Sequence, residues 1–250
     1  MKHAIGLIFA ALLGAAAASA ASITVTSVAD AGSGTYNLTN LGTTDWVHFS
    51  RIGDGLDSLR DDRAGSTAIG DLTSNQAIGG YGVGNSNPVL TSPSNTYSWT
   101  NGTPTAAASL PFGAIINGSG IQGVVSYFLP VAASTSSQRL VLFLGGFYLI
   151  PGQLPDPTGT LTASLNDGSG QTQSISFSGR RIATIDFTAD SASILSVSFG
   201  ADLGILPGTS ANFLTFDGAY LTNGPTGEGG GEVPEPSTLG LAGVGAVLLW

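Results

Sequence analysis

Cysteine is absent from the 250-residue chain. Without thiols the protein can form neither a disulfide nor a thiolate metal site, and it has no cysteine nucleophile. The stability of the fold therefore has to come from packing and hydrogen bonding.

Charged residues are also scarce, at 9% of the sequence. The only lysine is Lys2, and the three glutamates, Glu228, Glu232 and Glu235, all lie near the C-terminus. The formal net charge is -9, and the sequence has no basic stripe that could bind a phosphate backbone. We therefore expect no nucleic-acid partner, and anionic membrane surfaces are disfavoured.

Histidine is limited to His3 and His48, so a zinc site with two histidines is excluded once the N-terminus is removed. His48 follows Trp46 in an apolar run, which favours a structural histidine with hydrogen-bonded ring nitrogens. No glutamate or lysine occurs between Ala4 and Gly227, so acid-base catalysis would depend on aspartates, as in a glycosidase pair. The sequence pairs no two of these aspartates across a cleft. We therefore expect no enzymatic activity, and an aspartate-dependent hydrolase is the weakest alternative.

The N-terminus is typical of a secretory signal peptide over residues 1–20. Lys2 and His3 are followed by an apolar stretch rich in alanine, which ends in the cleavage box Ala18-Ser19-Ala20. We expect signal peptidase to cut between Ala20 and Ala21.

From Ser22 onward apolar and polar residues alternate with the period of two that is typical of half-buried strands. Trp46 and His48 are predicted on one face of a strand, with Val47 and Phe49 on the other. The sequence predicts one antiparallel β-sandwich of jelly-roll type over residues 21–222, and a glycine-rich linker over 223–232. The other strands are expected at Ile23–Val28, Ile78–Val83, Gly123–Leu129, Arg139–Ile150, Leu161–Leu165, Gln173–Phe177, Arg181–Phe187, Ile194–Phe199 and Phe213–Leu221, with Asn166-Asp167-Gly168 as a hairpin turn.

The last stretch, residues 233–250, joins a Pro-Glu-Pro step at Pro234, Glu235 and Pro236 to an apolar run. The run from Leu239 to Trp250 would be about 18 Å long as a helix, which is too short to cross a bilayer. This tail resembles the sorting signal of PEP-CTERM proteins, without their terminal arginine cluster. Either the chain is truncated relative to its gene, which we favour, or the signal is degenerate.

The resemblance implies an exosortase-type enzyme as a partner. It also implies export through the inner membrane, a transient membrane tether by the tail, and a final location at the cell surface or outside the cell. PEP-CTERM proteins are tied to exopolysaccharide and biofilm matrix, so the resemblance implies a non-enzymatic envelope or matrix protein.

The central region resembles a secreted bacterial β-sandwich module that has no settled function. The module's opening pattern N-L-T-x-x-G-T-x-D-W-x-H matches Asn37–His48. Two further patterns match Y-S-W-T-N-G-T-P-T at Tyr97–Thr105 and L-T-A-S-L-N-D-G at Leu161–Gly168. The resemblance spans roughly residues 36–222 and brings no catalytic residue with it.

Two groups of residues are candidates for ligand binding. Asp54, Asp57, Asp61 and Asp62 could supply oxygens to calcium, but the alternating arginines between Arg51 and Arg63 favour a solvated, salt-bridged loop without metal. We therefore expect no cofactor, with calcium as the alternative. The aromatic residues Tyr81, Tyr97 and Trp99, with Phe147 and Tyr148, could form a stacking platform for sugars, although core packing is expected for the last two. A carbohydrate-binding module for exopolysaccharide is thus the alternative function.

Overall fold

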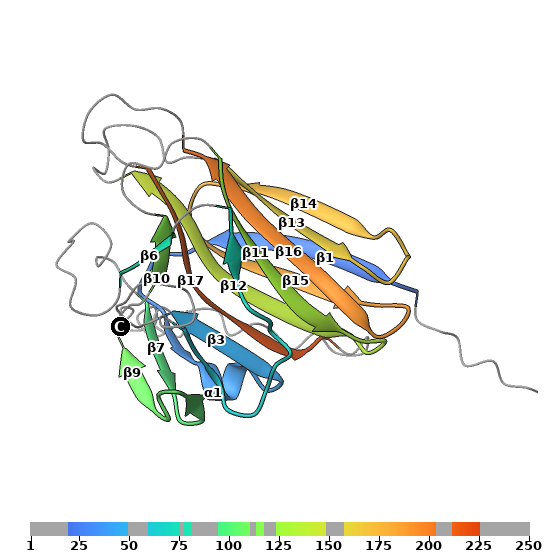
Figure 1. The fold of residues 1–250 in the computed structure, drawn as a ribbon, viewed down its shortest axis with the longest axis horizontal. Helices are drawn as coiled ribbons and strands as arrows, with labels where there is room; N and C mark the ends of the chain where they lie inside the picture. The colour runs from blue at the N-terminus through green and yellow to red at the C-terminus, as the bar shows by residue number, and fades with distance from the viewer. Residues whose placement is uncertain are drawn as a thin grey trace, which may run out of the picture.

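The computed structural model describes residues 20–49, 60–75, 78–81, 95–110, 114–117, 124–148, 158–203 and 212–225. These residues form three β-sheets and one helix of four residues, α1 (Leu38–Leu41). Figure 1 shows the long strands of the two larger sheets running beside each other. The predicted all-β, antiparallel sandwich is confirmed. Within the described ranges, no helix is long and apolar enough to cross a membrane.

The largest sheet has nine strands. Seven follow one another in space: β1 (Ser22–Ala29), β15 (Gly179–Thr188), β12 (Gln138–Tyr148), β17 (Asn212–Asn223), β3 (Asp45–Phe49), β4 (Arg60–Arg63) and β8 (Gly102–Thr103). The other two are β10 (Ala114–Asn117), which pairs with β17, and β6 (Ile78–Tyr81), which pairs with β10.

The second sheet has five strands, in the order β14 (Thr172–Phe177), β13 (Gly159–Leu165), β16 (Ser193–Asp202), β11 (Val124–Ala133) and β5 (Thr73–Ser74). The predicted turn after Leu165 joins β13 to β14 as an antiparallel hairpin. Gly168 in this turn has a φ of 86°, a backbone conformation that glycine adopts without a steric penalty.

The third sheet is small and contains β2 (Thr35–Asn37), β7 (Thr96–Trp99) and β9 (Ala108–Leu110). β2 and β7 are parallel, whereas the other strand pairs of the described residues are antiparallel. α1 directly follows β2 in the chain, and the strand beside β2 is β7, which comes from a distant part of the sequence.

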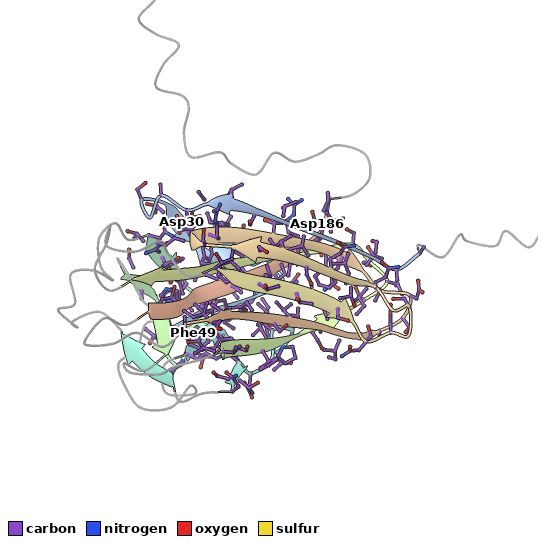
Figure 2. The ribbon with its side chains drawn as sticks, turned by 90° about the horizontal axis from the view of Figure 1, so that it is seen from above. Asp30, Phe49 and Asp186 are labelled. Atoms are coloured by element: carbon purple, nitrogen blue, oxygen red, sulfur yellow. The ribbon has the colours of Figure 1, made fainter. Side chains whose placement is uncertain are left out.

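The main core lies between the nine-stranded and five-stranded sheets. Its most deeply buried aromatic side chains are Phe49, Tyr127, Phe187, Phe199 and Phe216, each at most 2% exposed. Ring centroids 5.1–5.5 Å apart join Phe49 to Phe216, Phe216 to Phe199 and Phe199 to Tyr127, so the core is continuous from one sheet to the other. Figure 2 shows the side chains between the stacked strands, with Phe49 among them.

A second core fills the opposite face of the nine-stranded sheet. It contains Leu38, Trp46, Tyr97, Trp99, Val141 and Phe143, so α1 and the small sheet cover this face. The central strand β12 is therefore buried on both sides: Leu140 and Leu142 lie in the main core, while Val141 and Phe143 lie in the second. This arrangement explains the uninterrupted apolar run in the sequence of β12.

Strand β3 has the alternation that the sequence predicts. Val47 and Phe49 lie in the main core, and Trp46 lies in the second core with the His48 ring against Tyr97 and Trp99. All five residues of β3 are buried.

Candidate functional site

The outer face of the five-stranded sheet is covered with hydroxyl groups. Alternate residues of each strand point into the main core, and the residues between them point outward. Neighbouring strands pair these hydroxyls: Thr162 lies 2.8 Å from Ser174, and Ser164 lies 2.9 Å from Thr172, oxygen to oxygen. The outward hydroxyl residues are Ser126 of β11, Thr160, Thr162 and Ser164 of β13, Thr172, Ser174 and Ser176 of β14, and Ser196 and Ser198 of β16.

An open pocket of about 420 Å³ lies on this face. Its floor is at Gly200, which stands between Thr160 of β13 and Ser126 of β11 in one cross-strand row. A Cβ atom at Gly200 would lie 2.5 Å from the Ser126 hydroxyl oxygen and 2.7 Å from the Val125 carbonyl oxygen. Ser126 and the backbone of β11 therefore leave no room for a side chain at this position.

Phe128 forms a wall of the pocket. It lies two residues beyond Ser126 on β11, opposite Ser198, which in turn faces Thr162. Its side chain is 45% exposed, and it is the one aromatic residue among the large hydrophobic residues that the structure shows exposed, namely Val28, Val124, Phe128 and Ile194. An exposed ring beside several hydroxyls can stack on the apolar face of a sugar while the hydroxyls donate and accept hydrogen bonds.

Composition alone does not separate Phe128 from the core residues, because β11 carries aromatic residues on both faces. Val125, Tyr127 and Leu129 point into the core, whereas Ser126 and Phe128 point outward. One local signal could have identified Phe128: it lies two residues after Ser126 in the same strand, so both side chains point to the same face. Ser126 is polar, and polar residues of a half-buried strand belong on the solvent side.

The prediction of an exposed sugar platform is wrong for Tyr97 and Trp99. Tyr97 is 0% exposed and Trp99 is 1% exposed, because the small sheet presses both rings against the nine-stranded sheet. The indole nitrogen of Trp99 donates to the Thr105 carbonyl at 2.8 Å, so the polar end of this side chain is satisfied inside the protein. Tyr81 lies in β6, but its side chain is outside the described residues, as are those of Phe147 and Tyr148.

The structure separates the aspartates of the predicted calcium group. Asp61 and Asp62 are consecutive in β4, so their side chains leave opposite faces of the strand. Asp61 is fully buried and accepts the backbone N–H of Thr105 at 3.0 Å, whereas Asp62 pairs with Arg60 at 2.9 Å. Asp54 and Asp57 lie outside the described residues. In the part that is described, no three His, Cys, Asp or Glu side chains could hold a metal ion together.

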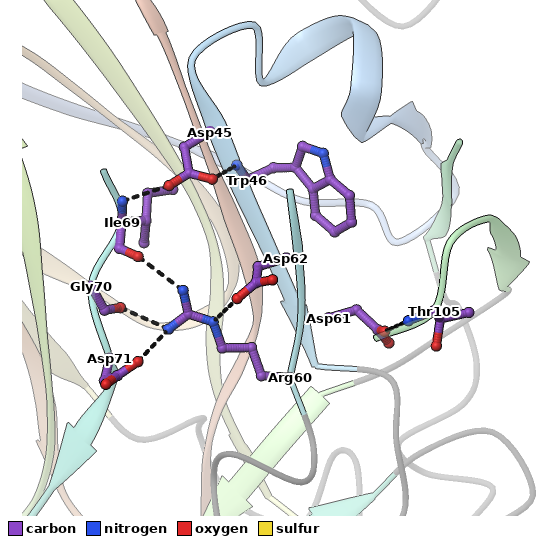
Figure 3. A network of polar contacts seen from close by, with 9 residues as sticks. All are labelled: Asp45, Trp46, Arg60, Asp61, Asp62, Ile69, Gly70, Asp71 and Thr105. Atoms are coloured by element: carbon purple, nitrogen blue, oxygen red, sulfur yellow. Dashed lines mark hydrogen bonds and ion pairs between the residues drawn. The ribbon is translucent and has the colours of Figure 1, made fainter. Parts of the chain in front are cut away.

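Residues 60–63 are thus a strand, where the sequence predicted a solvated loop. Pairing with β3 and β8 converts them to β structure, and Arg60 then ties this strand to a neighbouring segment. The Arg60 guanidinium donates to the carbonyl oxygens of Ile69 and Gly70, each at 2.9 Å, and contacts Asp71 at 3.1 Å (Figure 3). Asp45 accepts the N–H of Ile69 at 2.7 Å (Figure 3). Arg60 thus forms the predicted kind of salt bridge, with Asp62 and Asp71. The same guanidinium also holds the backbone at Ile69 and Gly70 in place.

A second polar network, which the sequence analysis missed, is buried between the nine-stranded sheet and the small sheet. Asp217 accepts from the Tyr97 hydroxyl and from Arg180, both at 3.0 Å. Asn95 donates to Asp30 at 2.7 Å, and Arg180 lies 3.5 Å from Asp30. Arg180 therefore forms ion pairs with both Asp30 and Asp217, whose side chains are 5% and 6% exposed.

A β-bulge places Asp217 in this network. The register of β12 against β17 shifts between Phe143 and Leu144, which pair with Gly218 and Phe216, so Asp217 is the extra residue. Burial raises the pKa of the Asp217 carboxyl to about 6, although Arg180 and the Tyr97 hydroxyl act in the opposite direction. These residues come from distant parts of the chain, so no local pattern could have grouped them.

His48 is fully buried, but neither of its ring nitrogens has a hydrogen-bond partner in the described structure. The predicted hydrogen bonds are therefore wrong. Its ring packs against Tyr97 and Trp99 at centroid distances of 4.5 and 5.4 Å. Burial lowers the pKa of His48 to about 3, so the imidazole is neutral at physiological pH.

The residues of the sorting signal, Pro234, Glu235 and Pro236, lie outside the described residues, as does Ala18. The structure does describe the backbone that follows the predicted cleavage bond. The nitrogen of Ala21 donates to Asp190 at 2.6 Å, so the start of the predicted mature chain is held against the sandwich.

Fold and pocket together define a β-sandwich with an open, hydroxyl-lined pocket on one outer sheet face. No protein-family model matches the sequence, and a comparison with curated proteins found no match. Among solved structures, the carbohydrate-binding module TmCBM61, in complex with beta-1,4-galactotriose, aligns with 61% of this chain and 86% of its own length, at 11% identity and a TM-score of 0.35. The enzymatically active domain of bacteriophage CBA120 tailspike protein 4 aligns with 62% of this chain and 20% of that chain, at 9% identity and a TM-score of 0.33. Similarity this distant extends neither a ligand nor an activity to this chain.

Proposed function

We propose that the mature chain is an exported, non-enzymatic protein of the bacterial envelope or extracellular matrix, and that its sandwich binds polysaccharide. The observation that carries this proposal is the pocket at Gly200, where Phe128 stands exposed beside rows of hydroxyls. Its volume of about 420 Å³ lies within the usual range for small-ligand sites, about 300–1,000 Å³. Because the pocket is open along the sheet, a sugar unit can enter it as part of a longer chain.

A binding role suits the pocket better than a hydrolytic one. Glycoside hydrolysis generally needs two carboxyl groups on either side of the bond. Among the described residues that line the pocket, Asp202 is the one carboxylate. Asp30 and Asp217 are close to each other through Arg180, but both are buried, so a polysaccharide cannot reach them.

The proposed location depends on the two ends of the sequence. Signal peptidase would remove residues 1–20, and an exosortase-type enzyme would recognise Pro234, Glu235 and Pro236 at the inner membrane. Cleavage there would release the sandwich to the cell surface or the medium, where exopolysaccharide is present.

Glycan-array binding of the chain expressed from Ala21 tests the binding function. Phe128→Ala removes the stacking ring and should weaken binding by about tenfold, which corresponds to about 1.4 kcal/mol. Ile194→Ala is the matched control, because Ile194 is 41% exposed on the same sheet and does not line the pocket. Equal binding by the two variants would show that this face is not the site.

Expression of the full chain with and without an exosortase, after addition of further apolar residues and an arginine cluster behind Trp250, tests the sorting function. We expect release from the membrane fraction only when the enzyme is present. Replacement of Pro234, Glu235 and Pro236 by alanine should keep the protein at the membrane. Release of this variant at the rate of the parent chain would contradict the sorting signal.

A further inference from the structure

The hydroxyls of the pocket continue beyond it toward the edge of the five-stranded sheet. Phe128 of β11, Ser198 of β16 and Thr162 of β13 line the pocket and lie side by side in one cross-strand row. The next member of this row is Ser174 of β14, the strand at the edge of the sheet. Ser174 is exposed and does not line the pocket. The row therefore leads from the exposed ring out of the pocket to β14.

A hydrogen bond between Thr162 and Ser174 joins the pocket to this edge strand. Their hydroxyl oxygens lie 2.8 Å apart. A hydroxyl both donates and accepts, so the bond between the two uses one donor and leaves the other donor and further lone pairs for a ligand. The bond also restricts the rotation of both side chains before a ligand arrives, which lowers the entropy cost of binding.

The direction along the strands is less suited to a sugar chain than the direction across them. Along β11, the outward residue after Phe128 is Pro130, and the first outward residue of the strand is Val124. Neither has a side chain that can form hydrogen bonds. In the cross-strand direction away from β14, β5 adds Thr73 beside Phe128 and is the last strand of the sheet. The longer run of hydroxyls therefore lies between Phe128 and β14.

The length of the row suits several sugar units. Neighbouring strands lie about 4.8 Å apart, so the steps from β11 to β14 cover about 14 Å. One glycosidic repeat of an extended pyranose chain is close in length to one such step, so the row has room for about three units. The pocket covers the part from β11 to β13, and Ser174 of β14 lies where the third unit would be.

We infer that the site binds a linear polysaccharide across the strands, with one unit on Phe128 and the chain passing over Ser198 and Thr162 to Ser174. This inference rests on the proposed carbohydrate-binding function and adds a subsite outside the pocket. Because Ser174 recognises the third unit, binding depends on chain length. The site then selects extended stretches of a polysaccharide over monosaccharides and disaccharides.

The test measures the affinity of the mature chain for linear oligosaccharides of increasing length. The probes are glucan, galactan and mannan oligosaccharides, from the monosaccharide to the hexasaccharide, measured by calorimetry. In a series that binds, affinity should rise by about fivefold from the disaccharide to the trisaccharide, as expected for one additional neutral hydrogen bond. It should level off in longer chains, because β14 is the edge strand.

Ser174→Ala separates the third subsite from the pocket. This variant should lower the affinity for the trisaccharide and longer chains by about fivefold and leave the affinity for the disaccharide unchanged. Thr172→Val is the matched control. Thr172 is exposed on the same strand and its hydroxyl lies 2.9 Å from that of Ser164, but neither residue lines the pocket. The control should bind every length as the parent chain does, and a thermal melt verifies that each variant folds.

The outcomes separate this inference from the proposed function. Equal affinity for disaccharides and longer chains, with Phe128 still required, would overturn the third subsite and leave carbohydrate binding in place. Equal effects of Ser174→Ala and Thr172→Val would show that the chain does not follow this row. If no probe of any length bound, the inference and the proposed function would both fall.

Discussion

At the scale of single residues, His48 makes the fold sensitive to acid. Its folded pKa of about 3 lies below the ordinary value of 6.5, because burial opposes the charged imidazolium. The unfolded chain therefore binds more protons than the folded chain between these two pH values. The stability contributed by this site is present above pH 6.5 and is lost as the pH falls toward 3, by up to about 5 kcal/mol.

His48→Phe should remove this acid sensitivity. Phenylalanine fits the aromatic surroundings of Tyr97 and Trp99, and the substitution breaks no hydrogen bond that the described structure shows. We expect the free energy of unfolding, measured in urea at pH 7 and pH 4, to fall less on acidification in the variant than in the parent chain. Asp217, whose raised pKa acts in the opposite direction between about pH 4 and 6, is present in both proteins and cancels in the comparison. An equal loss in both proteins would show that His48 is not the acid-sensitive group.

A second prediction at the scale of single residues concerns Asp190, which contacts the start of the predicted mature chain. Cleavage after Ala20 would turn the Ala21 nitrogen into a charged amine, 2.6 Å from the Asp190 carboxylate. We expect intact-mass measurement of the exported protein to show Ala21 as the first residue. Asp190→Asn should lower its free energy of unfolding by at most about 1 kcal/mol, as for an exposed ion pair. A chain that kept residues 1–20 after export would contradict the signal peptide.

At the scale of elements, the small sheet and α1 act as a cover for one face of the nine-stranded sheet. Their contact is partly apolar, through Trp99 and Tyr97, and partly polar, through the hydrogen bond of the Tyr97 hydroxyl to Asp217. Breaking a buried network by removing one partner costs more than the pair itself contributes, because the other partners stay desolvated.

Substitutions in this cover should reduce stability without any direct effect on the pocket. Trp99→Ala should cost about 3–5 kcal/mol, as expected for a large buried side chain, and Tyr97→Phe about 1–3 kcal/mol, since Asp217 and Asn95 each lose a partner. Phe128→Ala should change the free energy of unfolding by less than about 1 kcal/mol, because that ring is exposed. Urea denaturation measures all three. A large loss in Phe128→Ala with little change in Trp99→Ala would reverse the assignment of core and surface.

At the scale of the whole molecule, the sandwich has two cores that share the central strand β12. We expect residues 21–222 to unfold in one cooperative transition, which thermal melts can check. Reductant should have no effect on it, because the chain has no cysteine.

Removal of divalent metal should leave the melting temperature unchanged. Asp61 already binds the backbone of Thr105, and Asp62 already binds Arg60, so neither carboxylate is arranged for calcium. The check is a melt with EDTA and a second melt with added calcium. A clear decrease in EDTA, reproduced by Asp61→Asn with Asp62→Asn, would favour the calcium alternative.

The sequence by itself determined the all-β class and which residues of a strand share a face. The period of two correctly separated Trp46 from Val47, and the Asn166-Asp167-Gly168 turn correctly joined two strands. These features depend on neighbours in the chain, because alternation and turn conformation are local properties of the backbone. Export and sorting, which also depend on short local segments, remain predictions.

Tertiary structure decided which strand faces are covered. Tyr97 and Phe128 both occur in alternating strands, yet a third sheet buries Tyr97, and the outer face at Phe128 stays exposed. The pocket at Gly200 likewise requires three strands in register, and the network at Asp217 requires a bulge and three other segments of the chain. Periodicity reports the direction of a side chain, but what lies opposite that side chain depends on contacts between distant residues, which no local pattern contains.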